Sequence, residues 1–434
     1  TIMGFYLNAK DAYDMYKCET LKPFFVDKTS IIKELIPMVC EGNNFVCITR
    51  PRRFGKTIMA NMIGAFFSKG QDASDVFDGL SISDDQDSMK EMNQHNVIYI
   101  DFSEVDDECN SYTSYINNIK ELLREDLHRT YASIDFRPEA GVTEDLRRIY
   151  QETNQKFVFV FDEWDAIFHM SFITESDRKQ FLRFLKNLLK GKAYVSLVYM
   201  TGILPIAKYS SGSELNMFTE FTMGKSPAFS EYFGFTEAEV DTLYHRYRQI
   251  TVNPSITREG LKLWYDGYQA ASGERLYNPR SVVQALRYNH LESYWTSSGP
   301  YDEIFYYIEK NIAEVREDLA VMISGDCVPA KIQEYAATSM YLNTRDEIFS
   351  AMVVYGFLSY SNGYVSIPNK ELMDKFADML QKEQSLGYVY RLAKASEKML
   401  KATWNQDTET MEKILEFAHR VRSEERRVGK ECRS

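Results

Sequence analysis

The chain has 434 residues, of which 44% are hydrophobic, and it carries a formal net charge of −12 at pH 7. This length suffices for two or three domains, each with a core of its own. The acidic balance does not suit a protein that binds polyanions over its whole surface, although an acidic protein can still bind DNA through a local patch.

The six cysteines are scattered without a C-x-x-C pair, and the six histidines show no metal-binding spacing. Such cysteines are typical of reduced thiols in a cytoplasmic protein. No apolar run approaches the ~20 residues of a membrane-spanning helix, and no signal peptide is visible. We therefore expect a cytoplasmic protein that does not enter a membrane.

The first functional motif is the stretch Arg-Pro-Arg-Arg-Phe-Gly-Lys-Thr at residues 50–57, which follows an apolar strand pattern at 44–49 and precedes a helical pattern from Ile58. Backbone N–H groups in a loop that opens a helix form an anion site. We expect Lys56 to reach the β- and γ-phosphates of ATP and the Thr57 hydroxyl to bind Mg²⁺. The predicted nucleotide-binding residues are Arg52, Arg53, Phe54, Gly55, Lys56, Thr57 and Ile58. A Gly-Lys-Ser/Thr tripeptide alone is weak evidence, because it arises by chance in about one chain in five of this length. The full pattern is also degenerate, because Arg50 stands where a phosphate loop normally begins with glycine.

Further along the chain, residues 96–103 predict another central strand, and residues 112–127 and 143–154 predict amphipathic helices. The next strand pattern, from Lys156, ends in two adjacent acids. Asp162 is the second predicted metal residue, holding Mg²⁺ through water, and Glu163 is predicted to orient or deprotonate the attacking water. The alternative is an ordinary core strand followed by a solvated turn. The phosphate loop favours the catalytic interpretation, because ligands collect at the carboxyl ends of parallel strands.

The strand pattern at 194–202 ends in Thr201 and Gly202. Thr201 is predicted to sense the γ-phosphate or the attacking water, the alternative being a simple turn. The predicted catalytic residues are thus Glu163, Thr201 and Lys56. A last strand is predicted at 218–223, after a helix at 174–190. Alternation of strands and helices over residues 44–223 indicates a parallel α/β layer.

Together these motifs resemble the predicted AAA-ATPase-like family of bacterial proteins. The resemblance covers about residues 20–380, and the stretches that carry it are residues 25–29, 50–57, 162–165, 201–202, 234–240, 264–268, 277–281 and 367–369. In that family arginine is usual at the first glycine position. The resemblance implies a P-loop ATPase core with a strand inserted between the phosphate-loop strand and the Asp-Glu strand. Many members are fused to a C-terminal PD-(D/E)xK nuclease-like domain, but residues 386–434 contain no (D/E)-x-K triplet, so we expect no nuclease activity from this chain.

Helical patterns at 237–248, 258–265, 279–288 and 301–322 follow the sheet, and their many aromatic residues are more typical of packing than of a ligand cage. Residues 357–367 predict a hairpin about Asn362-Gly363. The predicted fold is an α/β P-loop NTPase sheet flanked by helices, followed by a helical region and a winged-helix-like unit. The predicted parts are an ATPase core at 1–228, a helical region at 229–335, a winged-helix-like lid at 336–385, a helical extension at 386–421 and a non-native or disordered tail at 422–434.

Two functions are compatible with this sequence. The first is a Mg²⁺-dependent ATPase that uses hydrolysis as a motor or switch, and Glu163 and Thr201 favour it. The alternative is a nucleotide-gated scaffold with little turnover that presents its helical region to a partner. The sequence leaves a nucleic acid or protein partner open. It also leaves an oligomer open, because an arginine that stabilises the transition state could come from a second subunit or from this chain. The candidates within the chain are Arg52, Arg53, Arg178 and Arg280, and a closing lid could also use Arg345. The winged unit could bind DNA, but closure over the nucleotide is the interpretation we favour.

Overall fold

The computed structural model describes residues 3–206, 214–295, 315–333, 342, 344–382, 398–399, 402–403 and 407–416. The chain divides into two compact units. The first comprises residues 1–254 and 270–287, and the second comprises residues 255–269 and 288–434. Most of the predicted helix at 301–322, most of the helical extension and the whole predicted tail lie outside the described residues. No described helix is long and apolar enough to cross a membrane.

The first unit is built on a sheet whose described strands run in the order β2-β3-β4-β1-β5, each parallel to its neighbours. The strands are β1 (Asn44–Thr49), β2 (Asn96–Asp101), β3 (Phe157–Asp162), β4 (Val195–Gly202) and β5 (Thr219–Thr222). All residues of β3 and β4 are buried, as expected for central strands of a parallel sheet. Because β4 lies between β1 and β3, the inserted strand that the resemblance implies is confirmed.

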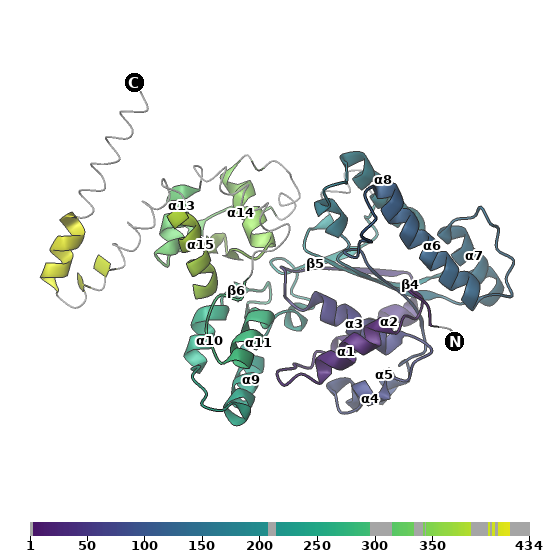
Figure 1. Ribbon diagram of the computed structural model, residues 1–434, viewed down its shortest axis with the longest axis horizontal. Helices are drawn as coiled ribbons and strands as arrows, with labels where there is room; N and C mark the ends of the chain where they lie inside the picture. The colour runs from purple at the N-terminus through teal and green to yellow at the C-terminus, as the bar shows by residue number, and fades with distance from the viewer. Residues whose placement is uncertain are drawn as a thin grey trace, which may run out of the picture. The chain divides into compact units, whose positions relative to one another are not determined.

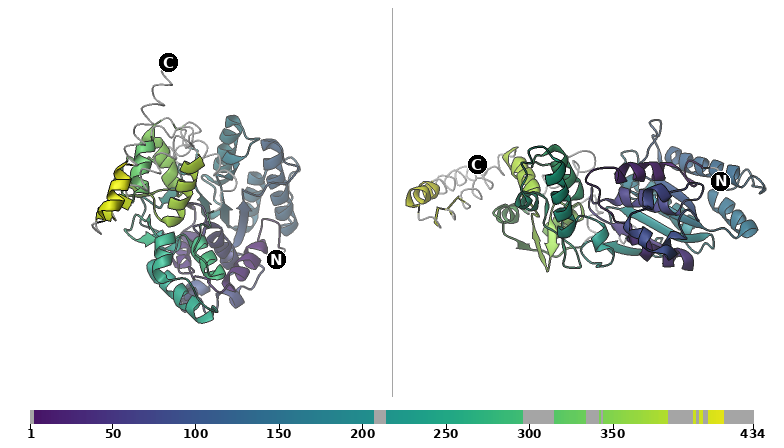
Figure 2. Two further views of the ribbon diagram at one scale, coloured as in Figure 1. Left: turned by 60° about the vertical axis from the view of Figure 1, so that its left-hand side comes forward. Right: turned by 90° about the horizontal axis from the view of Figure 1, so that it is seen from below.

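Helices cover both faces of this sheet (Figures 1 and 2). On one face, Val158 and Val160 of β3 pack with α1 (Asp11–Thr20), α2 (Ile31–Glu41) and α3 (Lys56–Phe67). On the other, Phe157, Phe159 and Phe161 of the same strand pack with α6 (Tyr112–Thr130), α7 (Val142–Thr153) and α8 (Glu175–Leu189). Side chains alternate between the two faces of a strand, so an unbroken apolar run serves two cores. The predicted P-loop NTPase sheet flanked by helices is confirmed.

Smaller elements complete the first unit. The segment between α3 and β2 contains the single-turn helices α4 (Ser74–Phe77), η1 (Ser81–Asp84) and α5 (Gln86–Met89), and η2 (Ala166–His169) follows β3. After the sheet come η4 (Ser230–Tyr232), α9 (Glu237–Ile250), β7 (Arg275–Leu276) and α11 (Pro279–Tyr288). Backbone hydrogen bonds in both directions join Phe235 to Tyr277, which ties the start of α9 to the segment before α11. The first unit therefore extends beyond residue 228, where we predict the end of the ATPase core.

The second unit contains α10 (Arg258–Tyr265), β6 (Tyr268–Gln269), α13 (Arg316–Ile323), α14 (Arg345–Val354) and α15 (Lys370–Lys382). A three-stranded sheet joins β8 (Val328–Pro329), β10 (Tyr364–Ser366) and β9 (Ser359–Ser361) in that order. Asn362 and Gly363, between β9 and β10, have φ angles of 50° and 87°, which are the left-handed values that a tight two-residue hairpin requires. The predicted hairpin about Asn362-Gly363 is confirmed and lies between α14 and α15 in the chain, and the winged-helix assignment stays a prediction.

Candidate nucleotide site at the carboxyl end of the sheet

The loop between β1 and α3 has the backbone shape of a phosphate loop. Gly55 has φ of 87° directly before α3, and Arg53 has φ of 68°. Left-handed values at these positions turn the chain sharply into the helix, and glycine adopts them without strain. No side chain caps α3, so the N–H groups of its first turn are left for a ligand. This geometry suits an anion at the start of α3.

Lys56 lies inside the loop. Its side chain is 5% exposed, and Nζ donates hydrogen bonds to the carbonyl oxygens of Arg50 at 3.1 Å and Pro51 at 2.9 Å. Burial lowers the pKa of Lys56, while the nearby acids, Glu163 foremost, act in the opposite direction. Lys56 is therefore a desolvated cation beside the loop's backbone donors, which is the environment in which a phosphate is bound most strongly.

Arg50, in the usual glycine position, has a structural role that the sequence did not reveal. Its guanidinium is buried, with Nη1 donating to the carbonyl oxygens of Thr49 and Phe221, each at 2.8 Å, and it lies 5.2 Å from the centre of the Phe233 ring. Its backbone N–H donates to Gly202 O at 3.1 Å. Arg50 thus fastens the phosphate loop to β4 and β5.

Asp162 and Thr201 form a buried pair at the ends of β3 and β4. Thr201 Oγ1 donates a hydrogen bond to Asp162 Oδ1, and both residues are fully buried. Asp162 Oδ2 has no hydrogen-bond partner among the described residues. A buried carboxylate oxygen without a donor is costly unless a cation or water approaches it. This oxygen fits the predicted role of Asp162 toward Mg²⁺.

Metal binding at this site would depend on few protein ligands. Within the described ranges no three His, Cys, Asp or Glu residues are grouped as metal ligands. Thr57, in the first turn of α3, exposes its side chain to solvent. This arrangement suits Mg²⁺, which keeps several waters and is commonly held by one or two protein groups together with substrate phosphates. The chemistry of Thr57 and Asp162 therefore fits the ion.

Glu163 follows Asp162 with φ of 47°, an uncommon value for a residue with a side chain. Burial raises the pKa of Glu163, whereas Lys56 lowers it. The turn is tight: a Cβ added to Gly202 would meet the Trp164 ring at 2.5 Å, and Trp164 N donates to Thr201 O at 3.0 Å. The close approach of two strand ends thus turns Glu163 away from the regular strand, at a backbone cost of order 1–3 kcal/mol.

Two further acids at this edge carry roles that the sequence motifs did not assign. Asp165 is buried, and its Oδ2 accepts from the N–H groups of Ile203 at 3.0 Å and Leu204 at 2.7 Å, so it shapes the exit from β4. Asp101 ends β2, and burial raises its pKa to about 7. For Asp101 the sequence contained a signal, an acid at the end of an apolar strand pattern, which is the signal that also predicted Asp162.

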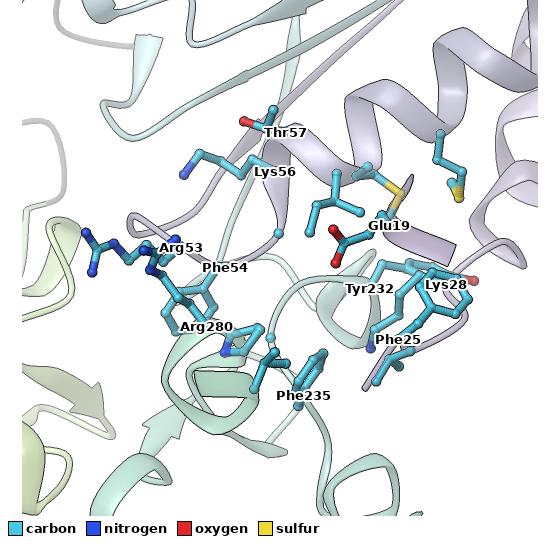
Figure 3. A pocket seen from close by; sticks show the side chains of 18 of the residues that line it. Glu19, Phe25, Lys28, Arg53, Phe54, Lys56, Thr57, Tyr232, Phe235 and Arg280 are labelled. Atoms are coloured by element: carbon cyan, nitrogen blue, oxygen red, sulfur yellow. The ribbon is translucent and has the colours of Figure 1, made fainter. Parts of the chain in front are cut away.

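A pocket of about 340 Å³ adjoins the loop, and all residues that line it belong to the first unit. The seven predicted nucleotide-binding residues, 52–58, all line it, and so does Glu163; Asp162 and Thr201 do not. Its other walls come from α1, residues 22–28, residues 232–235 and the start of α11. Figure 3 shows the basic side chains Arg53, Lys56 and Arg280 on one side of the pocket, with Phe54 among them. The aromatic side chains Phe25 and Tyr232 lie on the other side, beside Lys28 and Glu19. Three cations on one side and two aromatic rings on the other suit a ligand with phosphates and a flat ring.

Lys28 lies in the segment 25–29, which carries the family resemblance, and lines the pocket, but no sequence motif assigned it a role of its own. Its Nζ lies 2.6 Å from Glu239 Oε1 and also donates to the carbonyl oxygen of Glu231. Glu239 in turn accepts from the N–H of Thr236 at 2.9 Å within the capping box of α9. Lys28 therefore connects the pocket wall to the start of α9, a contact between residues 211 positions apart.

Comparison with known proteins finds a family model that matches the segment containing these features. Residues 14–211 match the model of a family described as predicted AAA-ATPase. No curated protein matches the chain. Among solved structures, a Walker-type ATPase of Pyrococcus abyssi is 11% identical with a TM-score of 0.43, and the match covers 80% of this chain and 95% of that one. The ORC2 protein of Aeropyrum pernix, in ADPNP and ADP complexes, is 11% identical with a TM-score of 0.38, covering 82% and 94%. The phosphate loop and the Asp-Glu strand end both lie inside the segment that matches the predicted AAA-ATPase family model.

Proposed function

We propose that the chain binds ATP with Mg²⁺ in this pocket and hydrolyses it. The observation that carries the proposal is the assembly of Lys56, Glu163 and the Asp162–Thr201 pair at one edge of the sheet, from three segments far apart in sequence. Such a set supplies phosphate binding, water activation and a metal partner, which are the parts that phosphoryl transfer to water requires.

Each residue has a defined task in this proposal. Lys56 turns from the loop carbonyls to the β- and γ-phosphates and offsets the charge that develops there. Glu163, as a carboxylate at the pocket wall, orients the attacking water and accepts its proton. Thr201 fixes Asp162 through the hydrogen bond between them. Mg²⁺, held by Thr57 and through water by Asp162, would neutralise charge on the phosphate oxygens.

Arg280 is the arginine we assign to the phosphates. Of the candidates named above, Arg52, Arg53 and Arg280 line the pocket. By contrast, Arg178 donates to Phe168 O at 2.9 Å and is not a lining residue. Arg280 comes from α11, beyond the matched segment, so it could report the state of the nucleotide to the elements that follow it. A planar guanidinium suits this task because it can bind two phosphate oxygens at once.

Arg345, the other arginine considered for a closing lid, has a different role. It lies in the second unit, where it forms an ion pair with Asp318, lies 3.2 Å from Asp346 Oδ1 and donates to Pro329 O at 2.6 Å. These contacts hold it among α13, β8 and α14. We therefore exclude Arg345 from the proposed phosphate contacts.

Steady-state phosphate release by the purified chain tests the proposal, with Mg²⁺ or EDTA and with or without DNA. We expect Mg²⁺-dependent turnover in the wild type. Tight ATP binding without turnover would instead support the scaffold alternative. A chain that neither binds nor hydrolyses ATP would refute both.

The same proposal includes a switch, in which ATP binding changes the conformation of the second unit. Hydrogen exchange with and without a non-hydrolysable ATP analogue tests it over residues 229–380. Protection at α10, α14 and α15 as well as at the pocket would support coupling, because a ligand shifts a conformational equilibrium only if it favours one state. Protection confined to residues 44–60 and 160–205 would mean that the switch has to be dropped.

A further inference from the structure

Asp101 stands in line with the two residues that form the buried pair. Parallel pairing sets Asp101 of β2 opposite Asp162 of β3, and the same register places Val97 opposite Val158 and Tyr99 opposite Val160. In-register side chains of neighbouring parallel strands share a face and stand about 5 Å apart. Asp101 and Asp162 are therefore neighbours on one face of the sheet.

The shared face is the one that carries the phosphate loop. Val97, Val158, Leu197 and Tyr199 all pack in the core formed with α3, and alternation along the strands puts Asp101, Asp162 and Thr201 on the same side. Lys56 opens α3 above this face. The sheet thus presents a row of three oxygen-bearing side chains, on β2, β3 and β4, toward the start of α3.

Along this row, one carboxylate oxygen is both buried and without a hydrogen-bond donor among the described residues. The Thr201 hydroxyl, on β4, donates a hydrogen bond to Asp162 Oδ1. Ser103 occupies Asp101 Oδ1 through its N–H at 2.8 Å and its hydroxyl at 2.6 Å. Asp162 Oδ2 is fully buried and finds no donor in the part of the chain that the structure describes. A second carboxylate next to an unpaired, buried carboxylate oxygen calls for a positive or hydrogen-donating group nearby.

We propose that Asp101 is a positioning residue for Mg²⁺, acting with Asp162 on water molecules in the ion's shell. This inference rests on the proposed function, since the ion would arrive with ATP. It explains why Asp101 stands in register with Asp162, whose Oδ2 has no donor among the described residues. Among the described residues no three His, Cys, Asp or Glu residues are grouped to bind the metal directly. Carboxylates that act through bound water orient the shell and tune metal affinity without touching the metal.

The test measures binding of a fluorescent ATP analogue to the full chain by anisotropy, in EDTA and in Mg²⁺, so that it does not depend on turnover. In the wild type Mg²⁺ should tighten binding. In Asp101→Asn the gain in affinity that Mg²⁺ produces should be about tenfold smaller, which is the scale typical of groups that support a metal's ligands. Its affinity in EDTA should be unchanged, which also shows that the variant is folded. Mn²⁺ titration followed by electron paramagnetic resonance, with ATP present, should show the same weakening directly.

Two variants sharpen the result. Asp107→Asn is the matched control, because Asp107 is an exposed acid of the loop that follows β2, and it should behave as the wild type. Asp101→Glu keeps the carboxylate and should recover part of the Mg²⁺ effect.

Three outcomes would overturn the inference. Full Mg²⁺ tightening in Asp101→Asn would show that Asp101 does not serve the ion, and equal weakening in EDTA and Mg²⁺ would show a merely structural role. A wild type that binds the analogue equally with and without Mg²⁺ would overturn the inference while ATP binding stands. Failure of the wild type to bind at all would instead overturn the proposed function, and this inference with it.

Discussion

Replacing Lys56 by alanine probes the centre of the site. In the free protein the change removes two hydrogen bonds, to the carbonyl oxygens of Arg50 and Pro51. In the complex it removes the buried cation that faces the phosphates. A hydrogen bond to a charged group contributes about 1.5–3 kcal/mol. Since 1.4 kcal/mol corresponds to a factor of ten, we expect ATP affinity to fall by roughly ten- to a hundredfold.

Thermal shift with increasing ATP measures this change, because a ligand at free concentration L stabilises the folded state by RT ln(1 + L/Kd) and so raises the melting temperature more when it binds more tightly. The free variant should also melt at a lower temperature than the wild type, since the two loop carbonyls lose their donor. Lys90→Ala is the matched control: Lys90 is an exposed lysine 2.6 Å from Asp87 and outside the pocket. If ATP shifts Lys56→Ala as far as it shifts the wild type, the nucleotide binds elsewhere and the reasoning fails.

Three other predictions concern the catalytic edge. Glu163→Gln should keep ATP binding while phosphate release falls by roughly 10²-fold or more, as for loss of a general base; an active variant would exclude this role. Because burial raises the pKa of Glu163, and the base acts when ionised, the rate should fall with decreasing pH at a pH above the ordinary glutamate value of about 4.3; a rate that holds down to that value would contradict the assignment. Thr201→Val should leave Asp162 without its donor, lower the free energy of unfolding by about 1–3 kcal/mol and slow turnover. Thr201→Ser should restore both the stability and the turnover. Denaturant unfolding and phosphate release measure these effects, and a Thr201→Val variant that matches the wild type in both would argue against the role of the pair.

Local pattern was sufficient for much of the fold. Apolar runs bounded by polar residues located the strands, because burial on both faces of a parallel sheet demands such runs. Asn362-Gly363 located a hairpin, since only such residues adopt two left-handed conformations in succession at low cost. At the candidate site, the segment 52–58 and Glu163 were predicted from the order of strand, loop and helix, and all of them line the pocket. These features depend on residues close together in the chain.

The tertiary structure decided what depends on distant residues. It placed Arg50 in a buried contact with Phe221 and Phe233, where the sequence showed only a departure from the glycine pattern. It brought Arg280 of α11 into the wall of the pocket and joined α9 to the first unit. It also set Asp101 in register with Asp162. Strand register and helix docking arise from packing between segments that are tens to hundreds of residues apart in the chain. The hydrophobic periodicity of a single sequence does not indicate which segments pack together.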